Sequence, residues 1–384
     1  MSFDTIANSR YITRVLTILG LWPMANGTGT WFGRYYRYYQ FFLHLTFTFT
    51  LALLMWLEVV LSENVEYATQ ILKMVLTETC LIVKVLSTWC HARTTRELLH
   101  EWEKSEYLVP HTREERFMWR RAQRVYYKVM GVYLIWSISA LILAFLSTCF
   151  MKTLQLPVPY WVPRKWRENN AWPTYVYDFL ALAFTCLCNT EIDLFQTYLI
   201  LHLTVCLRLC GMRLERLGDI GTDVGINREL VKIIQMHQRV RQMAKSCEKV
   251  VSLPVLAQII LSSMIICFTI YHLQSASLSD NPADFFAMLQ YAIVMSLQIF
   301  LPCYFANELT VESQSLSKHL YNADWIAMSA SNRRLIFLYM EYLKLPLVLH
   351  AGNYFKIGLP IFSKTMNNAY SLLALLVNVS DDGK

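Results

Sequence analysis

Long apolar segments constrain the fold of this 384-residue chain more than any other feature. A helix needs about 17–25 mostly apolar residues to cross the hydrocarbon core of a membrane. Seven segments approach this length: 38–61, 67–89, 126–150, 174–207, 250–273, 284–306 and a last one that ends near 378. The chain is 55% hydrophobic and only 16% charged, whereas about a quarter of the residues in soluble domains are charged. The sequence therefore predicts an all-α, polytopic membrane protein with seven transmembrane helices.

Basic residues predict how these helices are oriented. The N-terminal segment and the connections 90–125, 208–249 and 307–335 are rich in Lys and Arg, and the alternate connections are not. Because basic connections stay in the cytosol, we expect a cytosolic N-terminus and an extracellular C-terminus. Apolar residues at helical spacing in the basic connections predict a helical anchor layer in the cytosol. This orientation excludes a G-protein-coupled receptor, and in such a chain the net charge of +7 does not indicate nucleic-acid binding.

The residue types that carry catalysis show no enzyme pattern. The nine His are scattered, and most of the ten Cys lie inside apolar runs without any C-x-x-C pair. P-loop, dinucleotide-binding, zinc-protease and serine-hydrolase motifs are absent from the sequence. We therefore expect neither an enzyme nor a bound metal or cofactor.

Several charged residues of the second and fourth predicted spans lie among apolar residues. These are Lys73, Glu78 and Lys84 in the second span and Asp178, Glu191 and Asp193 in the fourth. Charges inside a bilayer are costly unless they face a partner or water. They either pair within the bundle or line an ion or transport pathway, and the sequence leaves both readings open.

The last span is preceded by residues that break helices. Pro346, Gly352, Gly358 and Pro360 follow each other within a short stretch, and such residues end or bend a helix. We expect a split seventh helix, with a cytosolic half near 330–349 and a membrane half that begins at about 357.

One face of the membrane half is polar, and we call it the polar stripe. Its members are Lys364, Asn368, Ser371, Leu375 and Asn378. They advance in steps of four and three, so they share one helical face. Such a face can line water if several copies surround an axis, and a ring of apolar side chains such as Leu375 can close a pore by dewetting. The alternative is that the face packs against neighbouring helices.

Two late stretches, 301–325 and 343–376, resemble the C-terminal third of the insect odorant receptor family. The matching residues are Tyr304, Asn307, Glu308, Ser315, Leu316, Tyr321, Trp325, Pro346, Gly352, Ala369, Tyr370 and Ser371. The final A-Y-S followed by leucines favours the odorant receptors over the related gustatory receptors. The chain also lacks the long insertion in the second inner loop of the shared co-receptor. It is therefore similar to an odour-specific tuning receptor rather than to the co-receptor.

The resemblance implies an odorant-gated, non-selective cation channel, assembled as a heterotetramer with the odorant co-receptor. Its ligand would be a small volatile odorant, and its place the plasma membrane of a sensory neuron dendrite, in contact with membrane lipid. Residues 1–306 would form a six-helix transmembrane bundle that holds the odorant pocket and its cytosolic extensions. Residues 307–384 would form the anchor and the split seventh helix that lines the pore. A gustatory-type ligand-gated channel and a secondary transporter are the alternatives.

By resemblance, the pore also falls on particular residues of the last helix. These are Ser371, Leu375, Asn378 and Val379. The gate residues of the co-receptor correspond to Leu375 and Val379, and its pore amide corresponds to Asn378.

The resemblance places the odorant pocket in the outer half of the bundle, among the second, third, fourth and sixth spans. A pocket for a volatile molecule should be mostly apolar, with few polar groups. The candidates are Tyr67, Ile71, Met74, Val75, Trp136, Ala140, Phe145, Phe179, Ala183, Phe184, Phe286, Gln290 and Ile293. Tyr67 and Gln290 offer directional hydrogen bonds.

Overall fold

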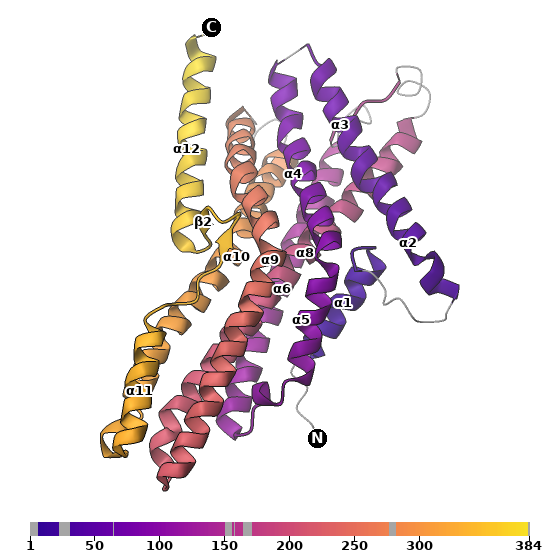
Figure 1. Cartoon of the computed structure of the whole chain (residues 1–384). Coiled ribbons are helices and arrows are strands. Elements are labelled where there is room, and N and C mark those ends of the chain that lie inside the picture. Colours follow the sequence, from indigo (N-terminus) through magenta and orange to yellow (C-terminus); the bar gives the residue numbers. More distant parts are fainter. Residues whose placement is uncertain are drawn as a thin grey trace.

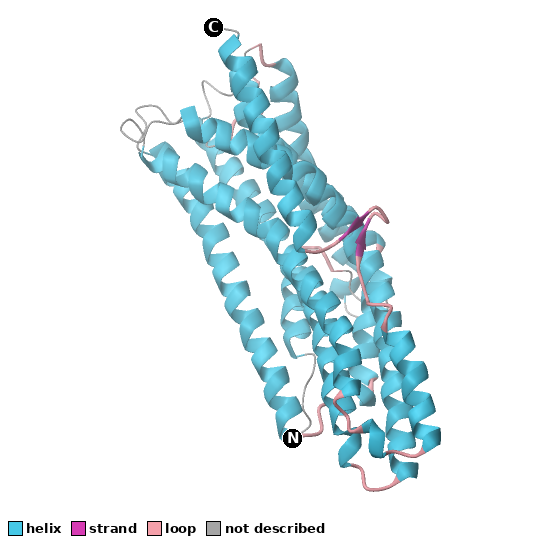
Figure 2. Cartoon of the chain, turned by 90° about the vertical axis from the view of Figure 1, so that its left-hand side faces the viewer, coloured by secondary structure: helices cyan, strands magenta, loops and turns pink. Residues whose placement is uncertain are grey.

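A computed structural model of the chain describes residues 7–22, 31–63, 65–149, 156, 158–163, 171–275 and 282–382. The molecule is an elongated bundle of long helices with one short two-stranded hairpin about halfway along it (Figure 2). This architecture confirms the predicted all-α fold.

Helices occur at all seven predicted spans. They are α2 (Trp31–His44), η1 (Leu45–Phe49, a π-helix) and α3 (Thr50–Leu61) for the first span, then α4 (Val65–Cys90), α6 (Arg113–Cys149), α8 (Ala171–Glu215), α9 (Asp223–Ser275), α10 (Pro282–Tyr321) and α12 (Leu359–Asp382). Among the described residues, five helices are long and apolar enough to cross a membrane: the α2–α3 unit, α6, α8, α9 and α10. The charged α4 and the striped α12 do not meet the same measure. The chain is thus a multi-pass membrane protein, while the count of seven crossings and their direction stay predictions.

Shorter elements complete the bundle. They are α1 (Ala7–Ile18), α5 (Ala92–Lys104), α11 (Ala330–Leu343), the single turns η2 (Glu106–Leu108), η3 (Arg216–Asp219) and η4 (Trp325–Ala327), and the strands β1 (His350–Ala351) and β2 (Phe355–Lys356). The amphipathic α1 packs against α8. Figure 1 shows α5 and α11 at the same end of the bundle, below the level of the hairpin.

The longest helices extend well beyond a bilayer. The helices α8, α9 and α10 contain 45, 53 and 40 residues. At about 1.5 Å per residue they are roughly 60–80 Å long, but the hydrocarbon core is only about 30 Å thick. About half or more of each helix therefore lies outside the hydrocarbon, which agrees with the predicted helical extensions.

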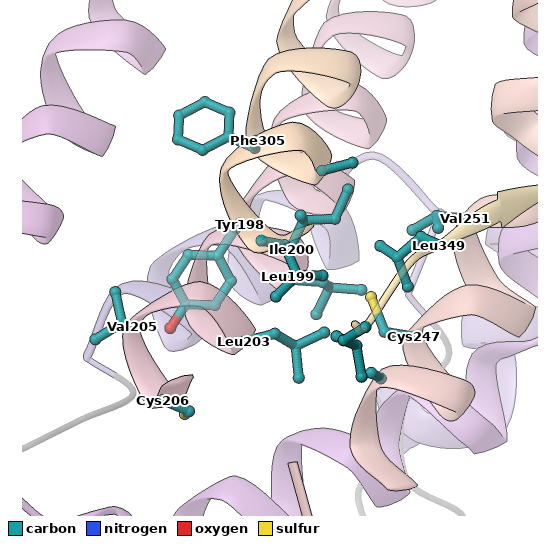
Figure 3. Close-up of a cluster of buried hydrophobic side chains, with 14 of the residues drawn as sticks. Tyr198, Leu199, Ile200, Leu203, Val205, Cys206, Cys247, Val251, Phe305 and Leu349 are labelled. Carbon is teal, nitrogen blue, oxygen red and sulfur yellow. The ribbon is translucent and has the colours of Figure 1, made fainter. Parts of the chain in front are cut away.

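The main hydrophobic core surrounds α8. Between Cys188 and Gly211, α8 is buried except at Leu201 and Arg208. Figure 3 shows side chains of α8 meeting Val251 of α9 and Leu349, which precedes β1. A helix that is buried on every side must be surrounded by other helices, so α8 is the central helix of the bundle.

The seventh helix is split as predicted. Between α11 and α12 the chain forms the β1–β2 hairpin, in which His350 pairs with Lys356 and Ala351 with Phe355. Both central residues of its turn, Gly352 and Asn353, have positive φ, a conformation that glycine adopts without steric cost. The Gly352 N–H donates to Ser252 Oγ of α9 at 2.7 Å, so the hairpin is fastened to α9.

Substituting Gly352 should loosen this attachment. A Cβ atom at Gly352 would lie 2.4 Å from Cδ2 of Leu256, and its φ is +59°. We expect Gly352→Ala to destabilise the receptor by about 1–3 kcal/mol through backbone strain. The measurement is the melting temperature of the receptor purified in detergent.

Gly358→Ala is the matched control. Its φ is not positive, and its Cβ would meet only Pro360 Cδ and Asn307 Oδ1, at the ordinary contact distances of 3.6 and 3.7 Å. Equal melting temperatures for the two variants would contradict a structural role for the Gly352 turn.

Candidate functional site

A cavity lies among α4, α6, α8 and α10, toward the end of the bundle where α3 meets α4. Its free volume is about 100 Å³. These four helices are the second, third, fourth and sixth spans, the same four from which the resemblance predicts the odorant pocket. Val158, from the connection between α6 and α8, covers one end.

Each helix presents residues three or four positions apart to the cavity. They are Met74, Glu78 and Leu81 on α4, Tyr133, Ser137 and Ala140 on α6, Leu182, Thr185 and Asn189 on α8, and Ala287, Tyr291 and Val294 on α10. This spacing keeps one helical face turned inward along two turns. Most of the wall is aliphatic, aromatic or thioether, and a few polar groups are set into it, as in typical sites for small apolar molecules.

Glu78 is the one carboxylate in the cavity wall among the described residues. Its side chain is 6% exposed. Oε1 accepts a hydrogen bond from Thr185 Oγ1 at 2.9 Å. Oε2 has no hydrogen-bond partner within the described part of the chain. A buried polar atom without a hydrogen-bond partner is unfavourable, so this oxygen marks a place where a donor from outside the chain would be stabilised.

A buried ion pair lies at one end of the cavity. Lys84 Nζ is 2.6 Å from Asp193 Oδ1, and the two side chains are 0% and 2% exposed. Lys84 also donates to Asn189 Oδ1 at 2.8 Å, and Gln298 donates to the same oxygen at 3.0 Å. The Tyr133 hydroxyl donates to Asp193 Oδ2 at 3.3 Å. These five residues, which we call the polar cluster, join all four helices around the cavity.

The sequence left the partners of the intramembrane charges open, and the structure pairs several of them within the bundle. Lys84 pairs with Asp193, and Lys73 Nζ lies 2.6 Å from His272 Nδ1 of α9. Lys73 also lies 2.8 Å from Met288 Sδ, which lines the cavity. For these residues, pairing within the bundle describes the structure better than a continuous charged pathway.

Three of the predicted pocket residues line the cavity: Met74, Ala140 and Phe145. Ile71 and Val75 belong to the hydrophobic cluster beside it.

The other candidates lie elsewhere on the same helices. Tyr67 donates to Glu58 of α3 at 2.9 Å, and Phe184 packs on His44 with Ala183 next to it. Gln290 donates to the Trp136 carbonyl at 3.2 Å. The partly exposed candidates are Trp136, Phe179, Phe286 and Ile293, which face away from the cavity.

The residues that sequence reasoning missed are mostly polar or small. On α10 the candidate Phe286 is 51% exposed, whereas the next residue, Ala287, is 2% exposed and lines the cavity. Likewise Ser137 lines the cavity and its neighbour Trp136 does not. Polar residues inside a membrane usually face the bundle interior. Glu78 and Ser137 were therefore the signal in the sequence that would have identified the inward faces of α4 and α6.

The polar stripe lies on the outer side of α12. Lys364, Asn368, Ser371, Leu375 and Asn378 are all exposed. The opposite face, with Ile361, Thr365, Ala369 and Leu373, is buried where α12 packs on α9 and, to a lesser extent, α10. The side chain of Val379 lies outside the described part of the structure. Within one chain, the stripe therefore does not pack against the chain's own bundle.

Comparison with known proteins gives a consistent match. The model of the family "7tm Odorant receptor" matches residues 64–370. Odorant receptor 94a of Drosophila melanogaster is 40% identical over 98% of this chain and 99% of its own length. Odorant receptor 46a, isoform A, of the same species is 26% identical over 95% of this chain and 96% of its own length.

Solved structures with the same fold are also found. The insect olfactory receptor OR5 from Machilis hrabei superposes with a TM-score of 0.84 at 18% identity, covering 98% of this chain and 100% of OR5. The same receptor in complex with eugenol gives a TM-score of 0.85 at 19% identity, with the same coverage. At this identity the likeness shows the fold.

The buried ion pair gives a prediction about stability. Lys84→Met leaves the Asp193 carboxylate buried without its counter-charge, which typically costs about 3–5 kcal/mol. We expect a marked loss of surface expression and a lower melting temperature. The double variant Lys84→Met/Asp193→Leu removes both charges, and we expect it to recover most of the loss.

Arg93→Met is the control, because Arg93 and Glu97 form an exposed pair at 2.9 Å with side chains 91% and 64% exposed. Pairs of this kind contribute little, so this variant should resemble the unmodified receptor. Failure of the double variant to improve on Lys84→Met would show that the two charges do not act as a pair.

Proposed function

Since the chain belongs to the 7tm odorant receptor family, we propose that it is the odour-specific subunit of an odorant-gated, non-selective cation channel. Family membership rests on the match over residues 64–370 and on the 40% identical relative, and it confirms the resemblance seen in the sequence. The family consists of receptors rather than enzymes. The other channel subunit in this proposal is the odorant co-receptor, in a heterotetramer in the plasma membrane of a sensory dendrite.

The cavity among α4, α6, α8 and α10 is the proposed odorant site. Its wall is mostly apolar. Three of the four helices around it, α6, α8 and α10, are long and apolar enough to cross a membrane. A solved relative of the same fold holds eugenol, a small aromatic phenol, which supports a ligand of similar size here. Met74, Ala140 and Phe145 are the predicted residues that remain in this proposal as direct contacts.

The proposed pore is formed by α12 from several subunits around a common axis. The polar stripe is exposed in the single chain while the opposite face of α12 is buried, as a pore-lining helix requires. Asn378 and Ser371 are the proposed water-facing residues, and Leu375 with Val379 the proposed gate. Residues 307–384, which include α11 and the hairpin, are the proposed anchor and pore module.

Coupling between the two sites is proposed to run through α9 and α10. Gln258 of α9 donates to the carbonyl of Gln298 at 2.7 Å, and Gln298 belongs to the polar cluster at the cavity. The same helix α9 carries most of the packing surface for α12. An odorant that binds the open state more tightly shifts the population toward it, and α9 offers a direct mechanical link to the pore helix.

The proposed assembly predicts a current that needs two subunits. Cells that express this chain together with an insect odorant co-receptor should carry an odour-evoked cation current, and cells that express this chain alone should not. A tag at the N-terminus should be reached by antibody only after the cells are permeabilised. Current from the chain alone would favour a gustatory-type channel, and concentrative uptake without current would favour a transporter.

The proposed pore predicts effects of two substitutions on the stripe. Leu375→Ala should raise the current without odorant, because a smaller side chain weakens the dewetted constriction. Asn378→Ala should change the permeability ratio of small to large cations. Both are measured under voltage clamp with the co-receptor present.

Leu372→Ala is the matched control for Leu375→Ala. Leu372 is 40% exposed on the same helix but lies off the polar stripe, so resting current should change less. Normal permeation in both stripe variants, with normal surface expression, would contradict the pore assignment.

A further inference from the structure

An unsatisfied carboxylate oxygen in an otherwise apolar cavity restricts what the cavity accepts. Glu78 is only 6% exposed, and its Oε2 has no hydrogen-bond partner among the described residues. The other oxygen is occupied by Thr185. A buried acceptor without a donor is unfavourable. A ligand that donates a hydrogen bond to this oxygen therefore binds more tightly than a ligand of the same shape that cannot.

The hydroxyl groups of Thr77 and Tyr291 in the wall already donate to other atoms. Thr77 Oγ1 donates to the carbonyl of Lys73 at 2.9 Å. Thr77 Oγ1 also lies 2.6 Å from the Tyr291 hydroxyl. A hydroxyl has only one proton, so Tyr291 is the donor in that contact. Neither hydroxyl keeps a proton for Glu78.

The hydroxyls on α6 are engaged in the same way. Ser137 Oγ donates to the carbonyl of Tyr133 at 2.8 Å, and the Tyr133 hydroxyl donates to Asp193 at 3.3 Å. The wall thus offers acceptors more readily than donors near Glu78.

The charges around the cavity bear on the choice between a neutral and a cationic ligand donor. Lys73 Nζ lies 2.8 Å from Sδ of the cavity residue Met288, and Lys84 Nζ lies 2.8 Å from Oδ1 of the cavity residue Asn189. The two lysines are only 3% and 0% exposed. Asp193 compensates the charge of Lys84. Moving a ligand ammonium out of water costs about as much as its attraction to one carboxylate returns, so a neutral donor is favoured over a cationic one.

We infer that Glu78 is a specificity-determining residue: it selects small, mostly apolar ligands that carry a neutral hydroxyl group, which donates a hydrogen bond to Glu78 Oε2. This inference rests on the proposed function, in that the cavity is taken to be the odorant site. It concerns one residue and one functional group of the ligand.

The test compares alcohols with their O-methyl ethers: the alcohol has an O–H that can donate a hydrogen bond, and the ether has none. The probes are benzyl alcohol with benzyl methyl ether and 1-hexanol with hexyl methyl ether. Each is measured twice, as evoked current with the co-receptor and as thermal stabilisation of the purified receptor. Leaving a buried acceptor unpaired corresponds to roughly fivefold to hundredfold in affinity, so the alcohols should act at concentrations lower than the ethers by about that factor.

Two substitutions at Glu78 separate the hydrogen bond from packing. Glu78→Leu removes the acceptor and should bring the alcohol-to-ether ratio close to one. Glu78→Gln keeps a carbonyl acceptor and should retain an intermediate ratio, which a purely structural role would not produce. If Glu78→Leu does not reach the surface, the ratio in Glu78→Gln still decides the question.

Glu191 provides the matched control. It is a second buried glutamate, also 6% exposed, and it lies on α8 outside the cavity lining. Glu191→Leu and Glu191→Gln should leave the ratio unchanged.

The possible outcomes separate this inference from the proposed function. Equal action of alcohols and ethers on the unmodified receptor, or a ratio that survives in Glu78→Leu, overturns the inference even if odorants evoke current. If benzylamine acts more strongly than benzyl alcohol, the inferred preference for a neutral hydroxyl over a cationic donor is wrong. Alcohol-selective stabilisation that depends on Glu78 but is accompanied by no current supports the inference and overturns the channel.

Discussion

Water is absent from the core of a bilayer, and this constraint governs how the polar side chains of the receptor are arranged. Lys84 and Asp193 are almost fully buried and form an ion pair at 2.6 Å, which is tolerable only if further hydrogen bonds satisfy both groups. Lys84 donates to Asn189, whose Oδ1 also accepts from Gln298, and Tyr133 donates to Asp193. Because these five residues come from α4, α6, α8 and α10, satisfying one ion pair also fixes the relative position of the four helices around the cavity.

The cavity is a consequence of that arrangement. One of its ends is set by the polar cluster and the other by the hydrophobic cluster that includes Ile71, Val75 and Phe145. Between these two ends, Glu78 is left with one unsatisfied oxygen. A site built in this way combines apolar burial, which gives affinity, with one directional acceptor, which gives selectivity.

The last helix shows a division of roles between its two faces. Small and apolar residues such as Thr365 and Ala369 attach α12 to its own bundle, so the polar stripe faces outward. A single helix cannot enclose water, because enclosing an axis takes several copies. The exposure of the stripe is therefore explained if other subunits surround it. The hairpin fastened to α9 holds α12 at the edge of the bundle, where other subunits can approach it (Figure 1).

The sequence by itself determined the helices, the break in the seventh and the family, since these follow from the length of apolar runs, from Pro and Gly, and from the motifs in 301–325 and 343–376. The resemblance to the family, rather than any pattern in the residues, pointed to the four helices that surround the cavity. The sequence did not determine which face of each helix turns inward: Phe286 and Trp136 were chosen, and Ala287 and Ser137 line the cavity. A large apolar side chain is equally well solvated by lipid and by a protein core, so hydrophobicity cannot distinguish the two. Only tertiary packing, through the partners that Lys84 and Asp193 require, decided the rotation of each helix.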